Sequence, residues 1–191
     1  MAALTFALGL RYRSASTGGC IDSAISHAIA TRTAPDPLFS PIVVRLGDPL
    51  PILVAGVVLA LFALRRGRPR MAALALIGPG SAGVVTVLLK PLIGRTYLGD
   101  LAFPSGHTAG ITAVSAVIAL MAVSFARSSL LTVTTLAATG VLLSGILMAF
   151  ALLSQGLHYP TDTLGGFATA IVVVLSIALI IDAVPPPDPL A

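Results

Sequence analysis

The chain has 191 residues, of which 57% are hydrophobic and only 9% are charged, and its mean hydropathy is +1.03. Soluble domains carry about 25% charged residues, so this composition excludes an ordinary soluble protein and predicts an integral membrane protein with a single helical bundle. The net charge of +4 falls mainly near segment ends, which argues against nucleic acid as a partner, and the single cysteine, Cys20, excludes an internal disulfide and a thiolate metal cluster.

The first residues are apolar but stop at Arg11-Tyr12-Arg13, and such a run is too short to span a membrane alone. We interpret Met1–Leu10 as the tail of a first span whose beginning is missing. A cleaved signal peptide is the alternative, although no positively charged region precedes the apolar run. Between Ile21 and Ile29 apolar residues recur at helical spacing, which predicts a short helix on the membrane surface.

Five later segments are candidates for membrane spans, each of which needs roughly 20 mostly apolar residues. They are 71–90, 108–126, 130–153, 162–182 and the shorter segment Pro49–Leu64. The predicted fold class is all-α: a polytopic transmembrane helical bundle with five full spans and a partial or truncated first span. A glycine-rich run inside the first long segment, Gly78–Gly83, is interpreted as a kink or a close helix contact rather than a substrate pathway.

Three regions follow from this assignment. Residues 1–48 hold the partial span and an extracytoplasmic surface segment, 49–183 form the transmembrane core, and 184–191 are a proline-rich, disordered cytoplasmic tail. Orientation comes from the connection Arg65–Arg70, which holds four arginines within six residues and is therefore expected in the cytoplasm. The ends of the other segments then bring the polar motifs described next to the extracytoplasmic face.

Two histidine-containing motifs lie at the ends of apolar segments. One is Phe103-Pro104-Ser105-Gly106-His107, and the other is His158-Tyr159-Pro160-Thr161-Asp162. Pro104 disfavours helix before it and Ser105 is a good N-cap, so the first motif opens a helix whose unpaired N–H groups favour a bound phosphate. In the second motif a spacing of four places the Asp162 carboxylate beside the His158 imidazole.

These residues suit the transfer of a phosphoryl group. A carboxylate that accepts a proton from one ring nitrogen leaves the other free as a nucleophile, so His158 is the candidate nucleophile. His107 is the candidate general acid for the leaving group. Lys90 and Arg95, together with Ser105 and Gly106, are the candidate phosphate-binding groups. No metal and no cofactor are required by this set.

The motifs resemble the type 2 phosphatidic acid phosphatase family of membrane lipid phosphatases, whose active site is related to that of vanadium haloperoxidases. The similarity runs from about Pro49 to Ala183, and it is carried by Lys90 with Gly94-Arg95, by the complete Pro104–His107 motif, and by His158 with Asp162. The resemblance implies a metal-independent phosphatase with six membrane helices and a phosphohistidine intermediate on His158.

The chain departs from the family pattern at two arginines. Tyr97-Leu98 stands where the first motif has Arg-Pro, and Ala151-Leu152 stands where the third has Ser-Arg. Arg95 is a candidate to replace one of these arginines, and Ser154 or Gln155 could supply a neutral donor near the other. Loss of one charged phosphate contact would cost about 2–4 kcal/mol of transition-state stabilisation if nothing replaced it.

The sequence therefore predicts a hydrolase of the bacterial inner membrane that removes phosphate from a lipid on the extracytoplasmic face. Candidate substrates are polyprenyl phosphates or diphosphates, phosphatidate and phosphatidylglycerophosphate. A weakened or inactive lipid-phosphate binder or transporter of the same fold is the alternative. A metal site made from His107, His158 and Asp162 is disfavoured because neighbouring cations would repel the ion.

Overall fold

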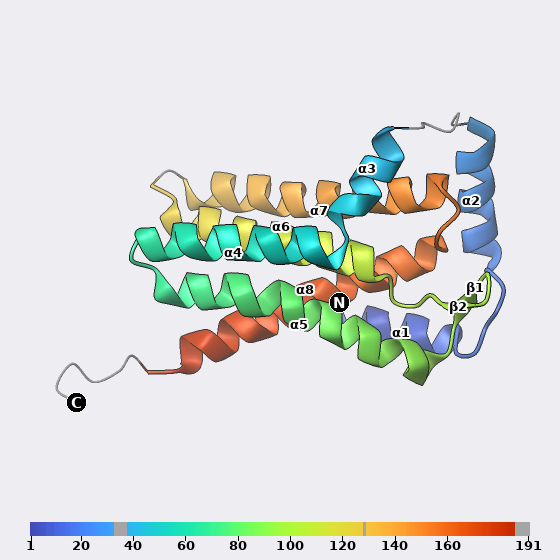
Figure 1. Cartoon of the computed structure of the whole chain (residues 1–191), viewed down its shortest axis with the longest axis horizontal. Helices are drawn as coiled ribbons and strands as arrows, with labels where there is room; N and C mark the ends of the chain where they lie inside the picture. The colour runs from blue at the N-terminus through green and yellow to red at the C-terminus, as the bar shows by residue number, and fades with distance from the viewer. Residues whose placement is uncertain (33–37, 128, 186–191) are drawn as a thin grey trace.

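Five long helices lie side by side and alternate in direction in the computed structural model, which describes residues 1–32, 38–127 and 129–185 (Figure 1). They are α4 (Pro49–Arg65), α5 (Pro69–Ile93), α6 (Gly106–Phe125), α7 (Leu130–Ser154) and α8 (Pro160–Ala183). Helix α6 is central because it packs against each of the other four. The predicted all-α transmembrane bundle is therefore confirmed as a class.

The predicted number of full spans is not confirmed. Within the described residues, only α5 to α8 are long and apolar enough to cross a membrane on their own. Helix α4 reaches that length only together with α3 (Phe39–Leu46), which joins it across a bend of 61°. Helix α1 (Ala2–Arg11) is a shorter apolar helix that packs against α8.

The long helices begin and end where the sequence chemistry favours it. Pro49, Pro69 and Pro160 each stand in the first turn of a helix, where a missing N–H costs nothing and the fixed φ is helical. Gly94 ends α5 with φ of +68°, a left-handed conformation that glycine adopts without steric cost. Pro79 lies inside α5, as is common in membrane helices.

Small side chains fill the centre of the bundle and let the helices approach closely. The buried cluster at this centre includes Ala63, Ala75, Ala82, Ala109, Ala113, Val117, Met121, Ala170 and Val174. Large apolar side chains instead cover the outside of the helices, for example Leu88, Leu131 and Leu179. Such an outer surface is suited to contact with lipid rather than water.

Smaller elements gather at one end of the bundle. Helix α2 (Cys20–Arg32) crosses that end and contacts α7 and α8 (Figure 1). A two-stranded antiparallel hairpin, β1 (Thr96–Tyr97) and β2 (Asp100–Leu101), lies beside it and pairs Tyr97 with Asp100. The predicted helix at 21–29 is confirmed, but its faces are reversed: Ile21 is 64% exposed and Asp22 is fully buried. Most of the predicted tail 184–191 lies outside the described residues.

Candidate active site

The predicted site residues gather at the end of the bundle that α2 and the hairpin cover. Lys90 is in the last turn of α5, His107 is in the first turn of α6, and His158 lies two positions before the first residue of α8. These helix ends lie opposite the connection between α4 and α5, which carries the arginine-rich segment Arg65–Arg70 (Figure 1). The site and the arginines are thus at opposite ends of the bundle.

The start of α6 is fixed by a side-chain cap and by close packing against α8. As the sequence predicts, Ser105 is the N-cap, and its hydroxyl oxygen accepts from the Thr108 N–H at 3.4 Å. The Ser105 N–H donates to the carbonyl oxygen of Asp162 at 3.0 Å, so this amide is not available to a ligand. A Cβ atom on Gly166 would come within 2.3 Å of the Ser105 carbonyl oxygen, so glycine is needed for this contact. Gly106 and His107 are the partly exposed members of the motif.

His107 is paired with a carboxylate that the sequence analysis did not single out. Its Nε2 lies 3.0 Å from Oδ1 of Asp48, the N-cap residue of α4. An ionised carboxylate can only accept, so in this pair Nε2 carries the proton. Both side chains are partly exposed, at 34% for His107 and 47% for Asp48. The position before Pro49 at a helix start was the available signal in the sequence.

His158 and Asp162 are neighbours, as their spacing predicts, but they are not hydrogen-bonded. Nδ1 of His158 lies 3.5 Å from Oδ2 of Asp162, and it has no hydrogen-bond partner among the described residues. Oδ2 of Asp162 instead accepts from the Tyr159 N–H at 3.1 Å. Asp162 is fully buried, whereas the His158 side chain is 11% exposed. The Asp162 carboxylate therefore faces the imidazole of His158, while its hydrogen bonds come from other groups.

Arg95 lies away from the phosphate-binding position predicted for it. The residue is fully buried, and its Nη1 donates to Oδ1 of Asp162 and to the hydroxyl oxygen of Thr161, both at 2.6 Å. The rings of Tyr12 and Tyr159 lie over its guanidinium, with centroids 3.9 and 4.6 Å from Cζ. These contacts make Arg95 part of the protein interior, where it pairs with a carboxylate of the candidate site.

Asp22 completes this buried cluster from helix α2. Its Oδ2 accepts from Nη2 of Arg95 at 2.7 Å, and its Oδ1 accepts from the N–H and the hydroxyl of Thr161 at 3.0 and 2.8 Å. Burial would raise the pKa of Asp22, but the hydrogen bonds from Thr161, Gly19 and Arg95 outweigh it and hold the pKa below its ordinary value. Asp22 is therefore ionised at neutral pH.

Tyr159 remains neutral beside this cluster. Burial raises the pKa of its hydroxyl, and the charges of Tyr97, Asp162 and Asp22 act in the same direction against the opposing effect of Arg95. Its ring also packs edge-to-face on Tyr97, with centroids 4.6 Å apart. Tyr159 therefore joins the buried ion cluster to the hairpin that covers the site.

Lys90 stands between two cavities that hold the two histidines. A cavity of about 210 Å³ contains His158 together with Lys90, Tyr97 and Asp100. A larger cavity of about 520 Å³ contains His107, and Lys90 lines it as well. Among the described residues lining the two cavities, Lys90 is the only lysine or arginine. It is therefore the cation best placed to meet an anion between the histidines.

The larger cavity continues from His107 and Lys90 as an apolar groove between α4 and α5. Its lining on α5 runs from Lys90 back to Ala75, which corresponds to about 22 Å of helix. Gly80 and Gly83 line it, and nothing would lie within 4 Å of a Cβ atom on either residue. The predicted packing role of the glycine-rich run thus holds for the buried Gly78, while these two glycines border open space.

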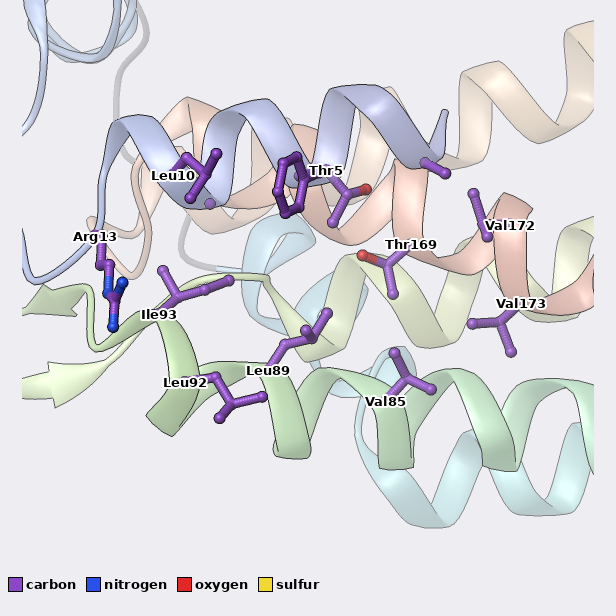
Figure 2. Close-up of a pocket in the computed structure, with 13 residues that line it drawn as sticks. Thr5, Leu10, Arg13, Val85, Leu89, Leu92, Ile93, Thr169, Val172 and Val173 are labelled. Carbon is purple, nitrogen blue, oxygen red and sulfur yellow. The ribbon is translucent and has the colours of Figure 1, made fainter.

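A separate apolar cavity of about 450 Å³ lies between α1, α5 and α8 (Figure 2). Arg13 is at one end and is the only ionisable side chain among its lining residues. None of the predicted site residues borders it. We therefore place the candidate active site at the two cavities joined by Lys90. Among the described residues, the candidate active site included, no group of three or more His, Cys, Asp or Glu residues is arranged to hold a metal ion.

Comparison with known protein families agrees with this geometry. The family model of the PAP2 superfamily matches residues 52–185, well over half of the chain. The chain belongs to the PAP2 superfamily. The resemblance identified from the histidine motifs is therefore confirmed.

A solved structure shares the whole arrangement of this PAP2 superfamily chain. It is the crystal structure described as the first transmembrane PAP2-type phosphatidylglycerolphosphate phosphatase, from Bacillus subtilis. The two superpose with a TM-score of 0.73 over 97% of this chain and 98% of the other, at 21% sequence identity. The similarity shows that the fold is shared. No curated protein sequence matches this chain.

The two positions where this PAP2 superfamily chain lacks a motif arginine have different surroundings. Leu152 is fully buried in the bundle and lines neither of the two cavities that hold the histidines. Tyr97 is partly exposed and borders the cavity of His158. The structure places neither Ser154 nor Gln155 in that cavity: Ser154 donates to the Ala151 carbonyl oxygen at 3.0 Å, and Gln155 donates to the same oxygen at 3.5 Å.

Proposed function

We propose that this chain is a membrane lipid phosphatase that hydrolyses a phosphomonoester or diphosphate of a lipid without a metal ion. The observation that carries the proposal is the position of Lys90, which borders both the cavity of His158 and the cavity of His107. A phosphate held by Lys90 between them would meet a nucleophile on one side and a proton donor on the other. Gly106, beside His107, adds a backbone donor at the start of α6.

The proposed reaction has two steps. The unprotonated ring nitrogen of His158 attacks phosphorus, the bond from phosphorus to the lipid oxygen breaks, and His107 gives its proton to that oxygen. Water then attacks phosphorus while His107 takes the proton that the water loses, a phosphorus–oxygen bond forms as the phosphorus–nitrogen bond breaks, and phosphate leaves with His158 restored. Asp162 faces Nδ1 of His158 and stabilises the positive charge that develops on the ring in the first step.

The apolar groove between α4 and α5 supports a lipid as the substrate. It starts at His107 and Lys90 and follows α5 along apolar and small residues, so a phosphate at the histidines would leave the lipid tail in the groove. Polyprenyl phosphates or diphosphates, phosphatidate and phosphatidylglycerophosphate all fit this description. The Bacillus subtilis structural neighbour is described as a phosphatase of the last of these.

Phosphate release from a panel of these lipids, measured in chelator with purified protein, tests the proposal. The wild-type protein should release phosphate, and His158→Ala should lower kcat by roughly four orders of magnitude because the nucleophile is lost. His27→Ala is the matched control, since His27 is exposed on α2 and lies outside both cavities. Activity that survived in His158→Ala, or that required a metal ion, would contradict the mechanism.

A lipid-phosphate binder without turnover is the second candidate function. It is favoured by the missing motif arginines, because Leu152 is buried and Arg95 is engaged with two carboxylates. The same panel separates the two functions: binding of lipid phosphate by the wild-type protein with no phosphate release on any member would support the binder.

A further inference from the structure

Asp22 lies in a buried hydrogen-bond network that links helix α2 to the candidate active site. Its carboxylate accepts four hydrogen bonds, from Arg95, from the N–H and hydroxyl of Thr161, and from the Gly19 N–H at 3.1 Å. Asp22 and Arg95 are fully buried, and Thr161 is 5% exposed. Because buried charges are costly unless they are paired, each member of this network depends on the others.

Arg95 carries this connection to the catalytic carboxylate. One end of its guanidinium donates to Asp22 at 2.7 Å, and the other donates to Asp162 at 2.6 Å. The tyrosine rings over the guanidinium restrict its movement. Asp162 is therefore shared between Arg95 on one oxygen and the Tyr159 N–H on the other, and His158 is left 3.5 Å away.

The charges of Asp22, Arg95 and Asp162 affect how strong a nucleophile the His158 imidazole is. Two carboxylates, those of Asp22 and Asp162, surround one guanidinium, so the three groups together carry a net charge of −1. If Asp22 were neutral, the whole charge of Arg95 would act on Asp162. Asp162 would then be a poorer acceptor for the Nδ1 proton of His158, and the imidazole would be a weaker nucleophile.

We propose that Asp22 is a positioning residue of the active site, acting through Arg95 to hold Asp162 in place and in charge balance beside His158. The inference rests on the proposed phosphatase function, because Asp162 has a role in catalysis only in that mechanism. Asp22 borders neither of the two cavities that hold the histidines, so a direct contact with substrate is not part of its role.

The simpler alternative is that Asp22 only anchors α2 to the bundle. The two roles differ in what happens when Arg95 is also neutralised. Arg95→Gln alone leaves two buried carboxylates without a cation, whereas Asp22→Asn with Arg95→Gln restores the net charge of −1 and frees Asp162 to pair with His158. If Asp22 is only an anchor, neutralising it in Arg95→Gln removes an unpaired buried charge and raises the folded fraction, but it leaves kcat of the folded protein unchanged. Charge balance predicts that kcat itself is higher in the double variant than in Arg95→Gln.

Kinetics of these variants on a lipid phosphate provide the first readout. In Asp22→Asn we expect kcat to fall about tenfold with KM within about twofold, because a positioning contact of the nucleophile is lost rather than a binding contact. The double variant should have a higher kcat than Arg95→Gln. Asp182→Asn, which removes an exposed carboxylate near the end of α8, is the matched control and should match the wild type. A double variant no better than Arg95→Gln would overturn the proposal.

The second readout needs no turnover, so it separates this proposal from the proposed function. Diethyl pyrocarbonate modifies neutral imidazole, and the rate at each histidine can be followed by peptide mass spectrometry at pH 8. We expect Asp22→Asn to slow His158 about threefold, because its imidazole becomes a weaker nucleophile, while His27 and His107 are unchanged.

The double variant should return the His158 rate to the wild-type value or above it, again without a change at His27 and His107. If Asp22→Asn does not fold, the double variant decides alone. A His158 rate that is unchanged in Asp22→Asn would overturn the proposal, as would faster modification of all three histidines, which would indicate a loosened structure. Wild-type protein that releases no phosphate would refute the proposed function, while these rates would still decide the coupling.

Discussion

At the scale of single residues, the contact between Asp48 and His107 offers a direct test of the general acid. The carboxylate lies 3.0 Å from Nε2 of His107 and accepts its hydrogen bond, so it fixes the orientation of the imidazole that acts as the proposed general acid. Asp48→Asn should lower kcat about tenfold for a lipid alkyl phosphate, whose leaving oxygen needs a proton. It should have little effect on p-nitrophenyl phosphate, whose leaving group departs without one.

Measuring kcat for both substrates in the same preparation checks this prediction, with Asp182→Asn as the control. The pair is partly exposed, so its loss should change the free energy of unfolding by no more than about 1 kcal/mol. An equal loss of kcat on both substrates would mean that Asp48 supports the site in some way other than through proton donation by His107.

The role expected for Arg95 shows where inference from the sequence fails at this scale. Its short distance from Lys90 in the chain predicts a phosphate ligand, but the structure pairs it with Asp22, which is 73 positions away, and with Asp162. No periodicity or motif marks Asp22 as buried, because its neighbours Ile21 and Ile25 predict the opposite face. The proximity of His158 and Asp162, by contrast, follows from a spacing of four on one helix turn.

At the scale of whole elements, the groove between α4 and α5 is a specific determinant of the substrate. Gly83→Leu would place a side chain into this groove, where a Cβ atom meets nothing within 4 Å. KM for a long-chain lipid phosphate should rise about tenfold, equivalent to the exclusion of one or two methylene groups. KM for a short, soluble phosphate ester should not change, because its phosphate does not require the groove.

Gly140→Leu is the matched control for this experiment. Gly140 is exposed on α7, and a Cβ atom there would also meet nothing within 4 Å, so both variants gain the same helix propensity. Kinetics of the two variants on long-chain and short-chain substrates give the comparison. If Gly83→Leu left KM for the long-chain lipid unchanged, the tail would have to lie elsewhere on the protein.

Elements were predictable from the sequence to different degrees, depending on their length. The long apolar segments predict α5 to α8 closely, since 71–90 lies within α5 and 130–153 within α7. The hairpin could not be predicted, because each strand has two residues and its turn holds Leu98 at φ of 51°, a conformation that is uncommon outside glycine. The bend between α3 and α4 likewise has no periodic signal before it.

At the scale of the whole molecule, the sequence predicts which groups lie at each end of the bundle better than it predicts the number of membrane spans. Apolar length alone suggests five full spans, whereas four described helices qualify singly and the fifth depends on the bent pair of α3 and α4. The opposition between the site and the arginine-rich loop follows from counting helices, and the structure has the same arrangement (Figure 1). Which end faces the cytoplasm then rests on the positive-inside rule.

Labelling of single cysteines tests this orientation. Cys20 is exposed on α2, at the end of the bundle that holds the site, and Arg66 is exposed in the connection at the other end. We expect an impermeant maleimide to label Cys20 in intact bacterial cells. In the Cys20→Ser background, Arg66→Cys should react only after the membrane is permeabilised, because we expect the three arginines that remain in the loop to keep it in the cytoplasm.

Leu98→Cys in the same background provides an independent point at the site end, since Leu98 is 86% exposed in the hairpin turn. It should react like Cys20 in intact cells. The reverse pattern, with Arg66→Cys labelled from outside and both site-end cysteines protected, would place the histidines on the cytoplasmic face. The substrate would then have to be a lipid phosphate of the inner leaflet, because Lys90 and both histidines share the end that carries Cys20 and Leu98.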